Sequence, residues 1–245
     1  VTDAFPREPI HSFFTHPMTT PSFQIAATAA AALVSCGISA QTFPVKDKTI
    51  TIVVPFTAGG PTDRVARDLV EALRKPLGGT TIVVENTAGA GSSIGIAKVA
   101  RATPDGYTLL LNHIGMATVP SLYRKLSFNV EKDFEYLGVI NDVPMTLIGK
   151  PTLPANNFKE LTGWIAANKG QINLANAGVG SASHLCGLML QSALKADMTS
   201  VPYKGAAPGT MAIVTGETQF MFDNMTASLA HIKAGKLRPL AVTGD

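Results

Sequence analysis

The fold is decided by residues 50–73, ITIVVPFTAGGPTDRVARDLVEAL, in which an apolar run, a glycine turn and a helical pattern follow one another directly. The β-branched residues at its start predict a short strand, which a proline and two glycines in 55–60 bring to an end. Pro61 suits the first turn of a helix, and Thr62 and Asp63 carry side chains typical of helix caps. The apolar residues that follow recur at helical spacing: Val65, Ala66, Leu69, Val70 and Leu73.

The loop 55–60 therefore ends where a helix begins. Gly59 and Gly60 have no Cβ, so a ligand can approach the backbone closely there. Unpaired N–H groups at a helix start form a natural site for a carboxylate or a phosphate. An ordinary strand-to-helix turn has the same pattern, and this loop alone does not separate the two interpretations.

The same alternation continues along the chain. Strands are expected at 81–85 and 107–111, with a helix opening at Ser92 or Ser93 between them, which predicts a parallel sheet with right-handed crossovers. Strands are also expected at 136–140 and 145–148. From residue 158 helices and strands alternate again, with strands at 172–175, 200–203, 219–222 and 237–242. Two α/β units in series predict two lobes.

Composition and the first forty residues indicate an exported protein. The chain has 245 residues, of which 46% are hydrophobic and 15% charged, a balance that argues against disorder. Residues 23–36, FQIAATAAAALVSC, have the length of a signal-peptide core and are too short to span a bilayer. Small residues before Gln41 predict cleavage after Ala40, while a lipoprotein attached at Cys36 is the alternative.

The formal net charge of +3 is mild. It is compatible with a small anionic ligand, and the basic residues are not clustered as nucleic-acid binding would need. No Cys/His or Asp/Glu cluster has metal-ligand spacing, so no metal is predicted. No cofactor is predicted either. Ser181, His184 and Asp223 invite comparison with a hydrolase, but no G-x-S-x-G motif accompanies them.

Two further glycine loops are candidate sites. Residues 89–95, GAGSSIG, have the spacing of a dinucleotide fingerprint, although 86–88 separate them from the strand and no acidic residue ends the next strand. A nucleotide-dependent oxidoreductase is therefore the alternative function. Residues 176–184, NAGVGSASH, open another helix, so a ligand held by this loop and by 55–60 would lie between two helix N-termini.

Several spaced motifs together resemble the Bug family, the TctC-like solute-binding proteins of tripartite tricarboxylate transporters. The resemblance extends over residues 41–245. The motifs that carry it are 52–63 (IVVPFTAGGPTD), 84–91 (VENTAGAG), 104–109 (PDGYTL), 180–185 (GSASHL), 201–205 (VPYKG) and 235–238 (GKLR).

The resemblance implies a periplasmic-binding-protein fold of type II with two α/β lobes. Residues 1–40 are then an extension and signal peptide, 41–111 the first part of lobe 1, 112–222 lobe 2, and 223–245 a return to lobe 1. Family members continue past the position of Asp245, so the first lobe would be incomplete at its C-terminal end. The domain boundaries rest on this resemblance and on the element pattern.

The implied function is capture of a small carboxylate, an organic acid or acidic amino acid, in the periplasm. The protein would act as a monomer, without catalysis, and would deliver its ligand to the membrane subunits of the transporter. The implied ligand-binding residues are Phe56, Ala58, Gly59, Gly60, Thr62, Asp63, Gly178, Gly180, Ser181, Ser183 and Asp223. Lys204 and Gly205 match the family less closely.

Overall fold

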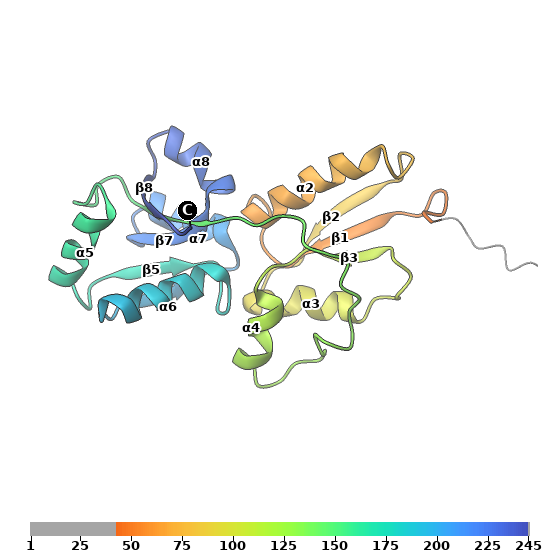
Figure 1. The fold of residues 1–245 in the computed structure, drawn as a ribbon, viewed down its shortest axis with the longest axis horizontal. Coiled ribbons are helices and arrows are strands. Elements are labelled where there is room, and N and C mark those ends of the chain that lie inside the picture. The colour runs from red at the N-terminus through yellow and green to blue at the C-terminus, as the bar shows by residue number, and fades with distance from the viewer. Residues whose placement is uncertain (1–42, 245) are drawn as a thin grey trace, which may run out of the picture. The chain divides into compact units, whose positions relative to one another are not determined.

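The computed structural model describes residues 43–244 (Figure 1). The expected leader, the cleavage position between Ala40 and Gln41 and the alternative lipid site at Cys36 lie outside the described residues.

The first three strands of the described chain form a parallel sheet. Its strands are β1 (Ile50–Val54), β2 (Ile82–Asn86) and β3 (Thr108–Leu110), in the order β2-β1-β3 with Ile52 opposite Val84 and Leu109. Right-handed crossovers to opposite sides of β1 place α2 (Pro61–Arg74) and α3 (Ser93–Ala100) on opposite faces. A 3₁₀ turn, η1 (Ala90–Ser92), precedes α3. Helix α4 (Gly115–Leu122) packs against η1 and α3. The predicted βαβαβ unit is confirmed.

The second sheet has five strands in the order β6-β5-β7-β4-β8. Strand β4 runs antiparallel to β7 and β8, whereas β5 runs parallel to β6 and β7. Its strands and helices are β4 (Met145–Gly149), α5 (Phe158–Ala167), β5 (Asn173–Asn176), α6 (Ala182–Leu194), β6 (Thr199–Pro202), α7 (Ala206–Val214), β7 (Phe220–Asn224), α8 (Met225–Lys233) and β8 (Arg238–Val242).

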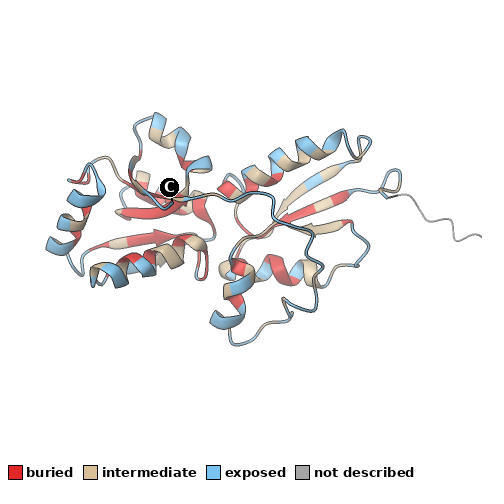
Figure 2. Cartoon of the chain, viewed as in Figure 1, coloured by how far each residue is buried: buried red, intermediate tan, exposed pale blue. Residues whose placement is uncertain are grey.

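Alternate residues of the second sheet enter different cores because strand side chains point to opposite faces. Leu147 and Phe222 join one buried cluster with side chains of α5 and α6. Ile148 and Met221 join another with Ile213 of α7. The central strands are consequently buried on both faces, as the red strands in Figure 2 show.

Two strand predictions need correction. Residues 136–140 belong to no strand, and the side chains of Leu137 and Val139 are 83% and 91% exposed. The strand predicted at 237–242 forms as β8, but it pairs with β4 in the second sheet and not with the first. Arg238 fixes it there by donating to the carbonyls of Leu153 and Ala155 at 3.1 and 3.0 Å. The lobe boundary expected at 222/223 therefore falls inside β7.

These positions predict a contrast between two leucine substitutions. Leu147→Ala should lower the free energy of unfolding by about 2–5 kcal/mol, because Leu147 is fully buried in the second sheet. Leu137→Ala should change it by less than about 0.5 kcal/mol, because that side chain is exposed. Urea unfolding followed by circular dichroism measures both, and a large loss for Leu137→Ala would contradict its placement.

Candidate functional site

The loop between β1 and α2 presents main-chain donors at the start of a helix. Gly60 is the N-cap residue of α2 and Pro61 is its first residue. Within 43–244, the N–H groups of Ala58 and Gly60 have no hydrogen-bond acceptor, and those in the first turn of α2 have none within the helix. The loop therefore offers donors at the positive end of a helix dipole.

Asp63 holds this loop in shape. Asp63 is 4% exposed, and its carboxylate accepts the N–H of Gly59 at 2.9 Å and two hydrogen bonds from Arg67 at 3.0 Å. Burial raises the pKa of Asp63, but the hydrogen bonds from Arg67 and Gly59 outweigh it and keep the pKa below 3.8. The N–H of Gly59 is thus occupied within the loop. The helix capping expected of Thr62 and Asp63 is wrong, because no side chain caps α2 and Asp63 bonds instead to the N–H of Gly59.

The loop after β5 is shaped by its own polar side chains. Asn176 ends β5, and its Oδ1 accepts the N–H of Gly178 at 2.9 Å. The Nδ1 atom of His184 accepts the N–H of Gly180 at 3.3 Å. Burial lowers the pKa of His184, so the imidazole is neutral and Nδ1 can serve as an acceptor. The N–H groups of both predicted glycines are therefore internal to the loop.

The start of α6 leaves two other N–H groups free. The Oγ of Ser181 caps the helix by accepting the N–H of His184 at 3.2 Å. The hydroxyl of Ser183 donates to the carbonyl of Phe222 at 2.6 Å and so ties the helix to β7. Neither Ala182 nor Ser183 has an acceptor for its N–H within the described part of the chain. These two groups are the donors that this loop can offer to a ligand.

The glycine loops meet one another. A Cβ on Gly91 would lie 2.1 Å from the carbonyl oxygen of Val179, and one on Gly178 would lie 3.4 Å from the Cα of Gly91. Thr118 of α4 donates to the carbonyl of Gly180 at 2.7 Å. The backbones of the loops 89–92 and 177–181 are therefore in direct contact, and a Cβ atom on either glycine would crowd this contact.

The loop after β6 contacts the first loop, 55–60. The N–H of Thr57 donates to the carbonyl of Lys204 at 3.3 Å. A Cβ on Gly205 would lie 2.6 Å from the Oγ1 of Thr57, and one on Gly60 would lie 3.9 Å from the nitrogen of Ala207. The first loop, the N-terminus of α2 and the start of α7 thus lie side by side.

Asp223 lies near the end of β7 and is 2% exposed. Its carboxylate accepts the N–H of Asn224 at 2.8 Å and the hydroxyl of Thr210 at 3.3 Å. Burial raises the pKa of Asp223 to about 6 despite these bonds. The residue before Asp223, Phe222, accepts the hydroxyl of Ser183 through its carbonyl. Asp223 therefore lies next to the point where β7 contacts the start of α6.

The glycine loop 89–95 does not offer a nucleotide the backbone approach that its spacing suggested. A Cβ on Gly95 would lie 2.6 Å from the Cβ of Pro55, and Gly91 faces Val179. These glycines are explained by contacts within the protein. The oxidoreductase alternative therefore has no support here.

Sequence reasoning missed Asn176, Thr118 and Thr57. Asn176 carried a usable signal, because an asparagine two residues before a glycine often accepts its N–H in a turn. Thr118 and Thr57 reach carbonyls or loops distant in the chain, and no local pattern marks them.

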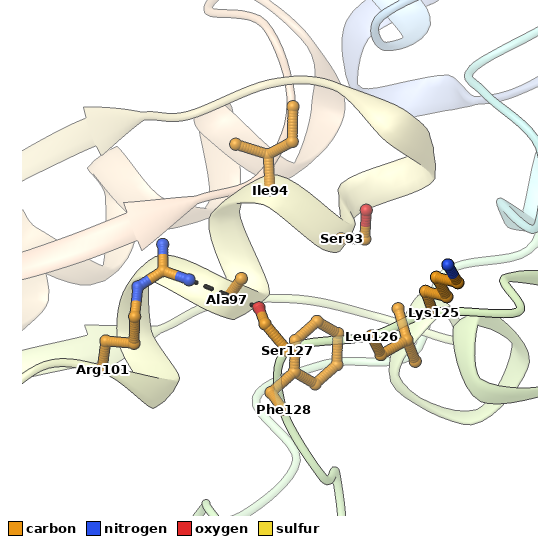
Figure 3. Close-up of a pocket in the computed structure, with 8 residues that line it drawn as sticks. All are labelled: Ser93, Ile94, Ala97, Arg101, Lys125, Leu126, Ser127 and Phe128. Atoms are coloured by element: carbon orange, nitrogen blue, oxygen red, sulfur yellow. Dashed lines mark hydrogen bonds between the residues drawn. The ribbon is translucent and has the colours of Figure 1, made fainter.

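A separate hollow of about 260 Å³ lies between α3 and residues 125–128 (Figure 3). Arg101 donates to the hydroxyl of Ser127 at 3.3 Å on one side of it. None of the residues predicted to bind a ligand lines it. Its lining residues are Ser93, Ile94, Ala97, Arg101, Lys125, Leu126, Ser127 and Phe128.

Among residues 43–244, no three His, Cys, Asp or Glu side chains are grouped so that they could hold a metal ion. No helix in that part of the chain has the length and apolar character needed to cross a membrane.

Two α/β sheets whose strand-end loops converge define the class of periplasmic binding proteins, and comparison with known proteins agrees. Residues 65–245 match the TctC family, described as the tripartite tricarboxylate transporter family receptor. The chain belongs to this family. The resemblance found from the sequence motifs is thereby confirmed.

Individual relatives support the assignment. A UPF0065 protein of Agrobacterium vitis is 42% identical over 194 residues, covering 79% of this chain and 56% of its own length. BugT of Bordetella pertussis is 34% identical over 219 residues, covering 87% and 65%. The structure of the periplasmic binding protein BugD is 47% identical with a TM-score of 0.77, covering 81% of this chain and 66% of that one.

The expected fold class is confirmed by these structures, which include MatC of Rhodopseudomonas palustris with bound malate, at 33% identity and a TM-score of 0.75 over 82% of this chain and 68% of that one. The chain spans between 56% and 66% of the length of the first three curated relatives it matches.

The two buried aspartates predict opposite effects of pH on stability. The pKa of Asp223 is raised from 3.8 to about 6, so its contribution is full below 3.8 and is lost as the pH rises through 6. Asp223→Asn should then stabilise the protein near neutral pH by up to about 3 kcal/mol, at roughly 1.4 kcal/mol per pKa unit.

Asp63 acts in the other direction. Its pKa is lowered, so it stabilises the fold above 3.8 and this contribution is lost as the pH falls below that value. Asp63→Asn should therefore lower stability at neutral pH. Urea unfolding between about pH 3 and 8 compares both variants with wild type, and the same sign for the two substitutions at neutral pH would contradict these environments.

Proposed function

We propose that this protein captures a small carboxylate through main-chain N–H groups. The observation that carries the proposal is a pair of loops with free donors, at Ala58 and Gly60 before α2 and at Ala182 and Ser183 in α6, both of which contact the segment 203–205. Both helix starts favour negative charge. Phe56 is buried beside the first loop, so the donors lie in a partly apolar surrounding, where hydrogen bonds to a charged group are strong.

The substrate class follows from the relatives. MatC of R. palustris was solved with malate, and Rpa4515 of the same organism, 32% identical to this chain, with adipate. Malate and adipate both carry carboxylates. Organic acids of this kind are therefore the ligands proposed for this chain, with acidic amino acids as further members of the class.

The protein binds its ligand without transforming it. Ser181 uses its hydroxyl to cap α6 by accepting the backbone N–H of His184, and it makes no bond to the imidazole. His184 in turn receives the N–H of Gly180, and Asp223 pairs with Thr210 and Asn224. These three side chains therefore form no catalytic triad.

The protein acts in the periplasm as a monomer and passes its ligand to the membrane subunits of a tripartite tricarboxylate transporter. The family description supports the transporter as partner, and the apolar segment 23–36 supports export to the periplasm. N-terminal sequencing of periplasmic material should begin at Gln41. A lipid on Cys36 would favour the anchored alternative, and a cytoplasmic protein that retains Met18 would contradict export.

Gly60→Val tests the binding site. Gly60 has φ −80° and ψ 174°, which any residue can adopt, and its new Cβ would lie 3.4 Å from the carbonyl oxygen of Thr57 and 3.9 Å from the nitrogen of Ala207. Blocking two hydrogen bonds worth about 1.5–3 kcal/mol each should weaken binding of malate or adipate by roughly two to four powers of ten. Isothermal titration calorimetry measures the loss.

Gly163→Val is the matched control, since a Cβ on Gly163 in α5 meets nothing within 4 Å. It should bind like wild type. Gly59→Val is a poorer probe, because Gly59 has φ +80° and valine there would be strained. Unchanged affinity in Gly60→Val would rule out this site, and binding of NAD(P) with turnover would restore the oxidoreductase alternative.

A further inference from the structure

Three buried polar groups without a partner gather at the start of α4. They are the Oγ of Ser92, the Nδ2 of Asn112 and the Nδ1 of His113, and no residue within 43–244 bonds to any of these atoms. Ser92 is 1% exposed. A Cβ on Gly115 would lie 2.7 Å from the Oγ of Ser92 and 3.6 Å from the Nδ2 of Asn112. Because Gly115 has no side chain, the Oγ of Ser92 and the Nδ2 of Asn112 can lie close to the first turn of α4.

This cluster, defined by Ser92, Asn112 and His113, borders both ligand loops. The ring of His113 stacks on Phe56 of the first loop with centroids 4.6 Å apart and planes 10° apart. Ser92 directly follows Gly91, whose backbone touches the loop of Gly178. The cluster is therefore connected to the first loop through Phe56 and to the second through Gly91.

The free atoms of the cluster are mainly donors. The Oδ1 of Asn112 accepts the N–H of His113 at 2.9 Å, whereas the Nδ2 of Asn112 has no acceptor among the described residues. Burial lowers the pKa of His113 to about 4, so its ring is uncharged at neutral pH and carries one N–H. The N–H of Gly115 also has no acceptor among the described residues.

Such a set matches a carboxylate, which has only acceptor oxygens. Leaving buried donors unpaired destabilises a fold, so an oxygen atom that accepts from them, in a ligand or an ordered water, would be stabilised there. An ionised carboxylate such as Asp223, which the family resemblance placed at the far end of the ligand, would repel a second anion. The cluster contains no acidic side chain.

We propose that the hydroxyl of Ser92, the amide of Asn112 and the N-terminus of α4 bind the second carboxylate of the ligand, so that the site selects dicarboxylates over monocarboxylates. This inference rests on the proposed function, in which the first carboxylate is held by the loops before α2 and α6. It assigns selectivity to side chains and capture to the backbone.

Calorimetry with matched pairs of acids tests the inference. Each dicarboxylate from malonate to adipate is compared with the monocarboxylate of the same carbon number, using the whole chain. Wild type should bind at least one dicarboxylate roughly 10- to 100-fold more tightly than its partner, the equivalent of one hydrogen bond to a charged group.

Ser92→Ala should remove most of this preference by weakening only the dicarboxylate. It should also raise the Tm without ligand, because it deletes an unpaired buried hydroxyl. Asn112→Asp, which keeps the size of the side chain, should abolish dicarboxylate binding by charge repulsion and spare the monocarboxylate. Thr218→Val is the matched control, since Thr218 is also buried and unpaired but precedes β7, at the opposite end of that strand from Asp223.

The outcomes separate the two proposals. If wild type binds both acids of every pair equally, or if Ser92→Ala leaves the preference unchanged or lowers the Tm, the cluster has a structural role and the inference is overturned. If wild type binds no carboxylate at all, the proposed function fails and the inference with it. A loss of preference in Thr218→Val would show that the effect is not local.

Discussion

The structure depends on the absence of Cβ atoms where loops from the two sheets touch. Val179 presents a carbonyl oxygen where a side chain on Gly91 would begin, and Gly205 leaves the same kind of space beside Thr57. The main chains of two loops can then come into direct contact, as in the hydrogen bond from the N–H of Thr57 to the carbonyl of Lys204. Close-packed loops in turn place the start of α2 beside the start of α7, and the loop before α6 beside the loop 89–92.

Much of the architecture could be predicted from the sequence. The run 50–54, the glycine turn and Pro61 are local signals, and local signals decide strands and helix starts. The pairing of β8 with β4 could not be predicted, because the donors of Arg238 and their acceptors at Leu153 and Ala155 are far apart in the chain. The segment 136–140 shows the converse, since its strand-like pattern found no partner strand within 43–244.

The sequence predicted which loops form the candidate site, but not which of their N–H groups are free to bind a ligand. The loops that contain Gly59 and Gly178 were identified, but both N–H groups turn out to be held by nearby carboxylate or amide oxygens. A sequence shows which residues lie at a helix start. It does not show which donors have already been taken by a side chain four residues later or two residues earlier, as with Asp63 and Asn176.

The position of β4 in its sheet has a consequence for how the chain folds. Ile148 is paired with Met221 on one side and Pro239 on the other, so both neighbours of β4 are synthesised much later than β4 itself. Such non-local pairings slow folding. Until β7 and β8 arrive, β4 is an apolar strand with two open edges, which is a hazard for self-association. A chaperone that shields 145–149 until the chain has been synthesised through β8 would therefore protect an edge that β4 cannot cover by itself.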